Sequence, residues 1–253
     1  MAIYESLDFC YDGRFSYDLG LINVRVEDGM YDEPFGSTRT IQEVKVRGWH
    51  KPHFQFVDTE PLEFELEFAF LGAYDDNKLR EVARWLTPSY YKPLYFLNNP
   101  DRIYYCMPVE DIRFIHNGLK QGYIKLKMRC DGSYAYSPYY TTDEIDTTEQ
   151  SSFVIDNLGD LPIRPEIGIT KIGDGDISII NTTNSGKEFK FVSLKNDEVI
   201  YVDNHWEHIE TNLVNIFRYT NFNNNWLELV TGRNVFNVTG GAKIMVRYQF
   251  MFI

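Results

Sequence analysis

Strict alternation in one ten-residue stretch constrains this chain more than any other feature. The stretch "PLEFELEFAF", residues 61–70, places five apolar side chains on one face and Glu63, Glu65 and Glu67 on the other. Alternation with period two is typical of a half-buried β-strand. Its apolar residues are Leu62, Phe64, Leu66, Phe68 and Phe70.

Two further runs alternate in the same way but carry basic outer faces. They are "YIKLKMRC", which contains Lys125–Arg129, and "EVKVRG", which contains Lys45–Arg47. Opposite charges on neighbouring strands stabilise a sheet by about 0.2–1 kcal/mol per pair. We therefore expect the Glu63–Glu67 strand to lie beside at least one basic strand. The alternative is that each charged face meets only water.

One segment has a helical period instead. In "YDDNKLREVARWLTPS" the apolar residues recur at i, i+3, i+4 and i+7, and Asp75 or Asp76 is a suitable N-cap. Thr87-Pro88 ends the pattern. The sequence predicts a single helix near Asp76–Leu86. The residues of the helical stripe are Leu79, Val82, Ala83 and Leu86.

The second half of the chain reads as short strands separated by turns. Residues 133–152 are polar and lack an apolar period, which is typical of a linker. We expect domains at 1–135 and 153–253, joined by a linker at 136–152. The many short strands favour an antiparallel sandwich or jelly roll. The expected strands are Phe153–Ile155, Arg164–Lys171, Asp176–Asn181, Lys187–Leu194, Glu198–Asp203, Asn215–Tyr219, Trp226–Leu229, Asn234–Val238 and Lys243–Phe252.

Composition excludes several classes of partner. The formal net charge is −12, so the surface repels phosphate backbones and nucleic-acid binding is not expected. Cys10, Cys106 and Cys130 are odd in number and widely spaced, which favours free thiols in a reducing compartment. No secretion signal and no apolar run of membrane-spanning length is apparent, so we expect a soluble protein made in the cytoplasm.

No motif in the sequence predicts catalysis, a metal or a cofactor. The pairs His50/His53 and His205/His208 have an HxxH spacing but lie outside the helical pattern and lack a third ligand. The turn "GDGD", which ends at Asp176, offers too few carboxylates for calcium and suits a hairpin. We expect no enzyme activity. The weak alternatives are a metal at a histidine pair and calcium at the turn.

Two tryptophans in the second half could stack on sugars. Trp206 and Trp226 lie beside Asn and Glu residues, as in carbohydrate-binding modules. The alternative is that both pack in the core or at the rim of a sandwich.

The order of segments resembles the distal tail proteins of long-tailed, non-contractile phages. "YDGRFSYDLGLINVRVEDG" is similar to their opening, and "PLEFELEFAF" to their long alternating strand. "KLREVARWL" with "YKPLYFLNNPDRIYYC" is similar to their helix and the strands that follow. "NLGDLPIRPEIGI" and "LVTGRNVFNVTGG" are similar to two turns of their C-terminal domain. The resemblance covers nearly the whole chain, but Met30–Glu43 departs from it.

This resemblance implies a mainly β protein with two domains. The N-terminal one would be a β-sandwich-like ring domain with one α-helix, and the C-terminal one an antiparallel sandwich resembling galectins or carbohydrate-binding modules. The protein would form a hexameric ring at the virion tail tip, assembled in the host cytoplasm. Its partners would be further copies of itself, the tail tube protein, a tail-tip or tail-associated lysin protein and a receptor-binding protein.

A ring subunit needs an apolar surface that reaches its neighbour. The segment "GMYDEPFGSTRTI" joins two strands and mixes apolar with polar residues. We expect an arm here, and the alternative is a loop that folds back over its own sheet. The expected interface residues are Met30, Tyr31, Pro34, Phe35 and Ile41.

Two rival functions follow from the same residues. A glycan-binding sandwich module would explain the aromatic residues, but not the single-helix first half. A hydrolase of unknown type has no motif in its favour.

Overall fold

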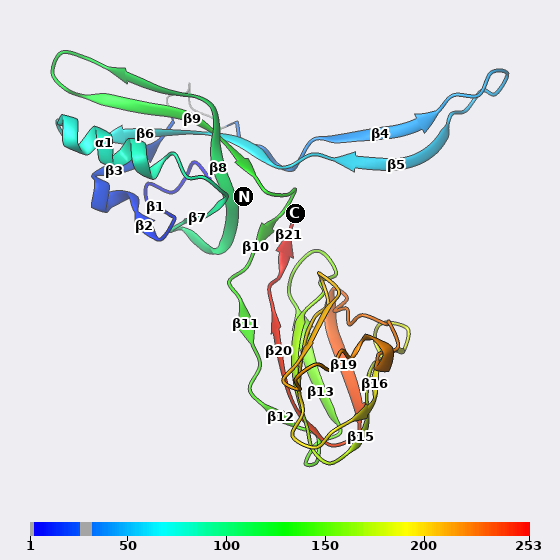
Figure 1. Ribbon diagram of the computed structural model, residues 1–253. Helices are drawn as coiled ribbons and strands as arrows, with labels where there is room; N and C mark the ends of the chain where they lie inside the picture. The colour runs from blue at the N-terminus through cyan, green and yellow to red at the C-terminus, as the bar shows by residue number, and fades with distance from the viewer. Residues whose placement is uncertain (1–2, 26–31) are drawn as a thin grey trace. The chain divides into compact units, whose positions relative to one another are not determined.

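The computed structural model describes residues 3–25 and 32–253 (Figure 1). The chain divides into two compact units, Met1–Tyr136 with Ile253, and Ser137–Phe252. Both are built almost entirely from antiparallel strands, so the expected mainly β class is confirmed.

The first unit contains one main sheet with the strand order β2-β1-β7-β8-β9-β6-β3. β10 pairs with β8, and β4 pairs with β5 as a separate two-stranded sheet. The elements of this unit are β1 (Phe9–Tyr11), β2 (Arg14–Phe15), η1 (Ser16–Leu19), β3 (Leu21–Val24), β4 (Arg39–Val44), β5 (His53–Thr59), β6 (Glu63–Phe70), α1 (Asp76–Trp85), β7 (Lys92–Phe96), β8 (Asn99–His116), β9 (Gly122–Cys130) and β10 (Ala135–Tyr136).

The expected pairing of acidic and basic strands is confirmed. β6 lies directly beside β9, with Glu65 opposite Lys127 and Glu67 opposite Lys125. Lys125 Nζ lies 2.9 Å from Glu67 Oε1 and 3.2 Å from Glu65 Oε2. The second basic run is not the neighbour, since β4 pairs with β5. The charged outer face of the sheet is therefore a ladder of ion pairs across two strands.

The single helix lies where the sequence places it. Asp75 is the N-cap and its carboxylate accepts a hydrogen bond of 2.8 Å from Lys78 N. The buried face differs slightly from the expected stripe, because Ala83 is exposed and Trp85 is buried. Trp85 Nε1 donates to Tyr11 O at 2.9 Å, so the indole joins α1 to β1.

The second unit is a sandwich of two antiparallel sheets. One has the order β11-β20-β14-β17-β18 with β12 also on β20, and the other has the order β13-β19-β15-β16. The elements are β11 (Tyr140–Thr141), β12 (Ile145–Asp146), β13 (Ser152–Asn157), β14 (Glu166–Lys171), β15 (Gly175–Asn181), β16 (Lys187–Leu194), β17 (Val199–Asp203), β18 (His208–Thr211), η2 (Tyr219–Asn221), β19 (Gly232–Thr239), β20 (Ala242–Tyr248) and β21 (Met251–Phe252).

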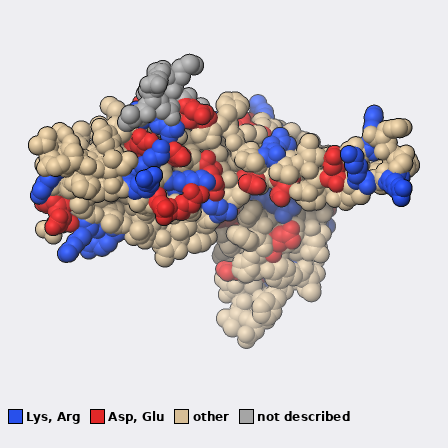
Figure 2. Space-filling view, turned by 90° about the horizontal axis from the view of Figure 1, so that it is seen from above, with Lys and Arg blue, Asp and Glu red and all other residues tan. Residues whose placement is uncertain are grey.

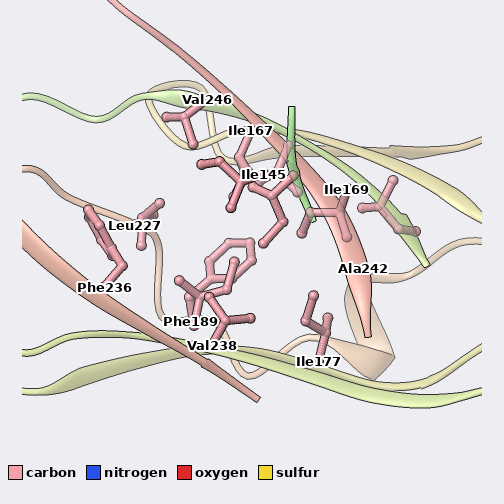
Figure 3. Close-up of a cluster of buried hydrophobic side chains, with 14 of the residues drawn as sticks. Ile145, Ile167, Ile169, Ile177, Phe189, Leu227, Phe236, Val238, Ala242 and Val246 are labelled. Atoms are coloured by element: carbon pink, nitrogen blue, oxygen red, sulfur yellow. The ribbon is translucent and has the colours of Figure 1, made fainter. Parts of the chain in front are cut away.

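Apolar side chains from both sheets meet between them (Figure 3). The inward residues alternate along each strand, as period two requires. Examples are Ile167 and Ile169 of β14, Ile177 of β15 and Val246 of β20, all of which are fully buried or nearly so. This core fixes which side chains of each strand face outward.

Three segments differ from the strands and linker expected from sequence. Residues 140–146, expected within the linker, carry β11 and β12, which pair with β20. Residues 215–218 and 226–228 are loops rather than strands, Tyr219 begins η2, and Leu229 forms only an isolated bridge with Ile163. Side chains take backbone hydrogen bonds there that a neighbouring strand would otherwise take. For example, Leu227 N donates to Asn204 Oδ1 at 2.7 Å.

All three cysteines are buried and free. Cys106 lies directly opposite Cys130 across β8 and β9. Burial raises the pKa of the Cys106 thiol well above its ordinary value, and the neighbouring Cys130 adds to the shift. In the residues described, no helix is long and apolar enough to cross a membrane.

Candidate interaction surfaces

The most unusual surface of the first unit is a β-hairpin that packs on little else. We call residues 39–59, which are β4, β5 and their connection, the arm. Almost every residue of the arm is exposed, including Ile41, Phe54 (63%) and Phe56 (55%). An isolated two-stranded hairpin is at best marginally stable in water. The exposed apolar residues therefore indicate a surface that is covered by something else.

The arm has apolar side chains on both of its faces. Ile41 lies opposite Val57 on one face, while Phe56 lies opposite Gln42 on the other. Phe54 precedes Phe56 by two residues, but the register shifts between them, so Phe54 lies opposite Glu43 and shares the face of Ile41. A partner that covered only one face would leave the apolar residues of the other face exposed to water. This favours insertion of the arm between two surfaces.

The tip of the arm is basic. Lys45, Arg47 and Lys51 lie between the two strands and are exposed, next to the exposed Trp49 (Figure 2). Within the described chain, no ion pair of these three cations is found. On a chain with a net charge of −12, such a tip suits an acidic surface.

The interface residues expected from sequence have separate positions. Met30 and Tyr31 lie outside the described residues. Pro34 is half-buried, Phe35 is 91% exposed, and Ile41 lies on β4 within the arm. Sequence reasoning missed Phe54 and Phe56. The alternation in "HFQFVD" indicates a strand with both on one face, but the register shift between them places them on opposite faces.

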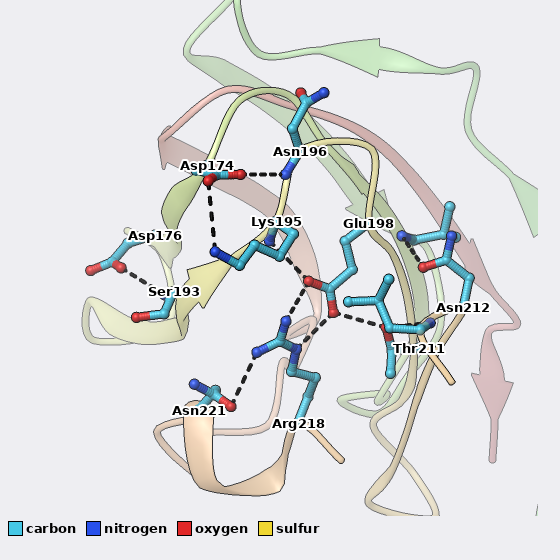
Figure 4. Close-up of polar contacts among 12 residues, drawn as sticks. Asp174, Asp176, Ser193, Lys195, Asn196, Glu198, Thr211, Asn212, Arg218 and Asn221 are labelled. Carbon is cyan, nitrogen blue, oxygen red and sulfur yellow. Dashed lines mark hydrogen bonds and ion pairs between the residues drawn. The ribbon is translucent and has the colours of Figure 1, made fainter. Parts of the chain in front are cut away.

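In the second unit a buried ion pair holds a long loop (Figure 4). Arg218 donates to Glu198 twice, at 2.7 Å from Nε to Oε1 and 2.6 Å from Nη2 to Oε2. Both side chains are buried. Thr211 Oγ1 and Lys195 N also donate to the same carboxylate, at 2.8 and 2.9 Å. Four hydrogen bonds thus satisfy Glu198, as a buried charge requires.

These contacts set the ionisation of Glu198. Burial raises the pKa of its carboxyl, but the hydrogen bonds from Arg218, Lys195 and Thr211 together outweigh burial. The net result is a pKa below the ordinary value, so Glu198 is ionised at neutral pH.

The loop that this pair holds exposes apolar residues. Val214 and Phe217 (81%) are exposed to solvent within four residues of Arg218. Since the guanidinium is fixed, the neighbouring backbone is held in place as well.

The two tryptophans expected as a glycan platform differ in exposure. Trp206 is 77% exposed, and its backbone N–H donates to Asp203 Oδ1 at 3.0 Å, which fixes the turn. Trp226 packs against the core and lies 4.8 Å from Phe222 between ring centroids. Trp206 thus remains available to a ligand, while Trp226 has a packing role.

The residues weighed as metal ligands have other roles. Asp174 accepts from Asn196 N at 2.8 Å and Asp176 from Ser193 N at 3.0 Å, so both hold the adjoining turn (Figure 4). The hydrogen bond from Asn196 and the nearby Lys195 lower the pKa of Asp174. His208 contacts Glu210 at 2.9 Å. In the described ranges, no group of three or more metal-binding side chains occurs.

Comparison with known proteins identifies the family. A profile described as phage tail protein N-terminal domain matches residues 4–132, and one described as phage tail C-terminal domain matches residues 134–248. The chain belongs to this phage tail protein family. It is also 34% identical over 252 residues to the SPbeta prophage-derived uncharacterized protein YomH of Bacillus subtilis (strain 168), covering 99% of this chain and 100% of that protein.

The fold of this phage tail protein matches solved tail-tip structures. SPP1 Dit (gp 19.1), described as a paradigm of hub adsorption apparatus in Gram-positive infecting phages, has a TM-score of 0.71 at 18% identity, over 96% of this chain and 98% of the other. A chain of the phage P2 baseplate in its activated conformation has a TM-score of 0.50 at 8% identity, over 95% and 97% of the chains. The resemblance to distal tail proteins is confirmed, and these matches are to structural proteins rather than enzymes.

Proposed function

We propose that this tail protein is a homohexameric hub at the tip of the phage tail. In this role it joins the tail tube to the proteins that contact the host, namely a tail-tip or tail-associated lysin protein and a receptor-binding protein. The virion tip is its final location, and assembly takes place in the host cytoplasm. The full-length likeness to a hub protein supports this role.

The single observation that carries the proposal is the exposed apolar arm. Phe56 on one face and Ile41 with Phe54 on the other would leave apolar surface exposed in a monomer. In a ring, each copy would insert its arm against the next, which is a head-to-tail interface that closes by rotation. Phe35 and the half-buried Pro34 lie just before the arm and belong to the same proposed interface, with Met30 and Tyr31 preceding them.

The basic tip supports a second copy as the receiver. Each copy carries a large negative charge, so the cations of one tip are attracted to its neighbour.

Light scattering on the purified full chain tests the ring. We expect a mass six times the 29.7 kDa of one chain. The double variant Phe54→Ser/Phe56→Ser should shift the mass towards one chain. The control is Phe217→Ser, which removes a still more exposed phenylalanine from the other unit and should keep the ring. A monomeric wild type would contradict the proposal.

A second candidate function rests on Trp206. Its exposed indole sits on a turn fixed by Asp203, which suits stacking against a sugar ring. Loss of glycan binding in Trp206→Ala, with an intact ring, would support this function.

A further inference from the structure

A glycine lies at the centre of an exposed sheet face in the second unit, where nothing in the fold requires one. Gly168 is in the middle of β14, and β14 lies between β17 and β20. A Cβ added there would meet only Met245 O, at 4.0 Å, and the backbone does not have a positive φ. Glycine in a strand interior weakens the strand, and it often marks a close approach by a ligand.

The glycine opens a notch between two outward side chains. Tyr201 of β17 and Met245 of β20 lie directly opposite Gly168 on its two sides. Both are exposed, while the residues that precede and follow Gly168 face the core. The bottom of the notch is the backbone of Gly168, and its sides are the aromatic ring of Tyr201 and the thioether of Met245.

Polar groups with fixed orientation border the notch. Arg247 Nη1 donates to both carboxylate oxygens of Glu166, at 2.7 and 2.9 Å. Tyr201 Oη donates to Glu166 Oε2 at 2.9 Å, and the Arg247 guanidinium lies 3.8 Å from the ring centre of Tyr139. Each group is held by another, so the site is preorganised for a ligand.

We propose that this face binds a neutral saccharide. The Tyr201 ring offers an apolar face for a pyranose, and Glu166 with Arg247 offers an acceptor and donors for its hydroxyls. The cations of this face are already paired, Arg247 with Glu166 and Lys243 with Glu144 at 2.7 Å. An anionic polymer would therefore gain little from them. The site does not depend on the ring or on Trp206.

A substitution at Gly168 can remove saccharide binding while the protein remains folded. A Cβ fits the space, and valine suits a strand better than glycine, so Gly168→Val should keep or raise the melting temperature while it fills the notch. The matched control is Asn237→Val, which adds valine at an exposed position of β19 in the other sheet.

The full chain is tested on immobilised short neutral oligosaccharides of glucose, galactose and N-acetylglucosamine, with poly(glycerol phosphate) as the anionic probe. We expect binding to at least one neutral oligosaccharide and none to the phosphate polymer. Gly168→Val and Tyr201→Ala should each weaken binding by about tenfold or more, a loss expected when stacking and close contact are removed. Asn237→Val should not change it.

Three results would overturn the assignment. They are absence of binding to every neutral probe, binding only to the phosphate polymer, and undiminished binding by a folded Gly168→Val. A loss in Trp206→Ala but not in Gly168→Val would move the sugar site to the turn at Trp206. The oligomeric mass of each variant shows separately whether the proposed ring is retained.

Discussion

A single buried carboxylate organises one end of the second unit. Glu198 receives hydrogen bonds from Arg218, Thr211 and the backbone of Lys195, and so joins β18 and the loop after it to the turn before β17. A buried ion pair contributes little net stability when both partners are present, but loss of one partner leaves an uncompensated charge. The pair therefore acts mainly to fix the loop at one position.

Removing one partner of this pair should be far worse than removing both. We expect Arg218→Met to lower the free energy of unfolding by about 3–5 kcal/mol, because Glu198 would remain buried and charged. The double variant Glu198→Leu/Arg218→Met should recover much of that loss. Urea unfolding of the full chain measures both, and equal losses in the two variants would contradict the argument.

The same pair predicts a dependence on pH. The pKa of Glu198 is depressed in the folded state, so its contribution is present above the unfolded value of about 4.3 and is lost as pH falls through the folded value. Wild type should therefore lose stability in acid more steeply than Glu198→Leu/Arg218→Met. Unfolding curves between neutral pH and about pH 3 would show the two converging.

Strand pairing in the first unit illustrates how elements select their neighbours. Glutamates of β6 face lysines of β9, so the register with the charges matched is favoured over one in which like charges meet. The apolar inner face fixes the same register independently, since Leu66 lies opposite Leu126.

A double-mutant cycle measures this contribution. Glu67→Gln and Lys125→Gln, separately and together, should give a coupling free energy of about 0.2–1 kcal/mol. The coupling should shrink in about 1 M salt, because exposed charges are screened. A coupling that is unchanged by salt would mean that the pair acts through packing instead of charge.

These elements also show where sequence reasoning ends. The period-two pattern predicted β6 and β9, and their charges predicted the pairing. Both were possible because the apolar inner face and the charged outer face of each strand can be recognised in the sequence. Residues 226–229 alternate apolar and polar residues in a similar way, but the side chain of Asn204 takes the Leu227 backbone hydrogen bond, and only Leu229 pairs, in an isolated bridge to Ile163. The Gly168 notch left no signal, since only the register places Tyr201 and Met245 beside it.

At the scale of the whole molecule, the arm is the part of the first unit whose apolar residues are left exposed. Alternation identifies an apolar face but does not say whether that face is buried in its own core or by a partner. Val57 and Phe56 of β5 read like core residues, yet they are not packed in one. This ambiguity is why the sequence pointed to the segment before the arm and missed its second strand.

The charged tip of the arm predicts a salt-sensitive assembly. Lys45→Ser/Arg47→Ser/Lys51→Ser should slow ring formation and make its rate less sensitive to salt, because steering between opposite charges is screened by ions. The control is Lys187→Ser/Arg233→Ser, which removes two positive charges from the second unit. Stopped-flow dilution with light-scattering detection measures the rate of ring formation. If the assembly rates of the tip variant and the control variant depended equally on salt, a role for the tip would be contradicted.

In the proposed hexameric ring, an arm that reaches only forward has a consequence for mixtures of intact and armless copies. In a head-to-tail ring every copy gives one arm and receives one. A copy without residues 39–59 would still receive its neighbour's arm but could not pass the connection on. It would act as a chain terminator, and the yield of complete hexamers would fall as the sixth power of the intact fraction. A phage that carries one good and one armless copy of this gene would thus be dominated by the defective one.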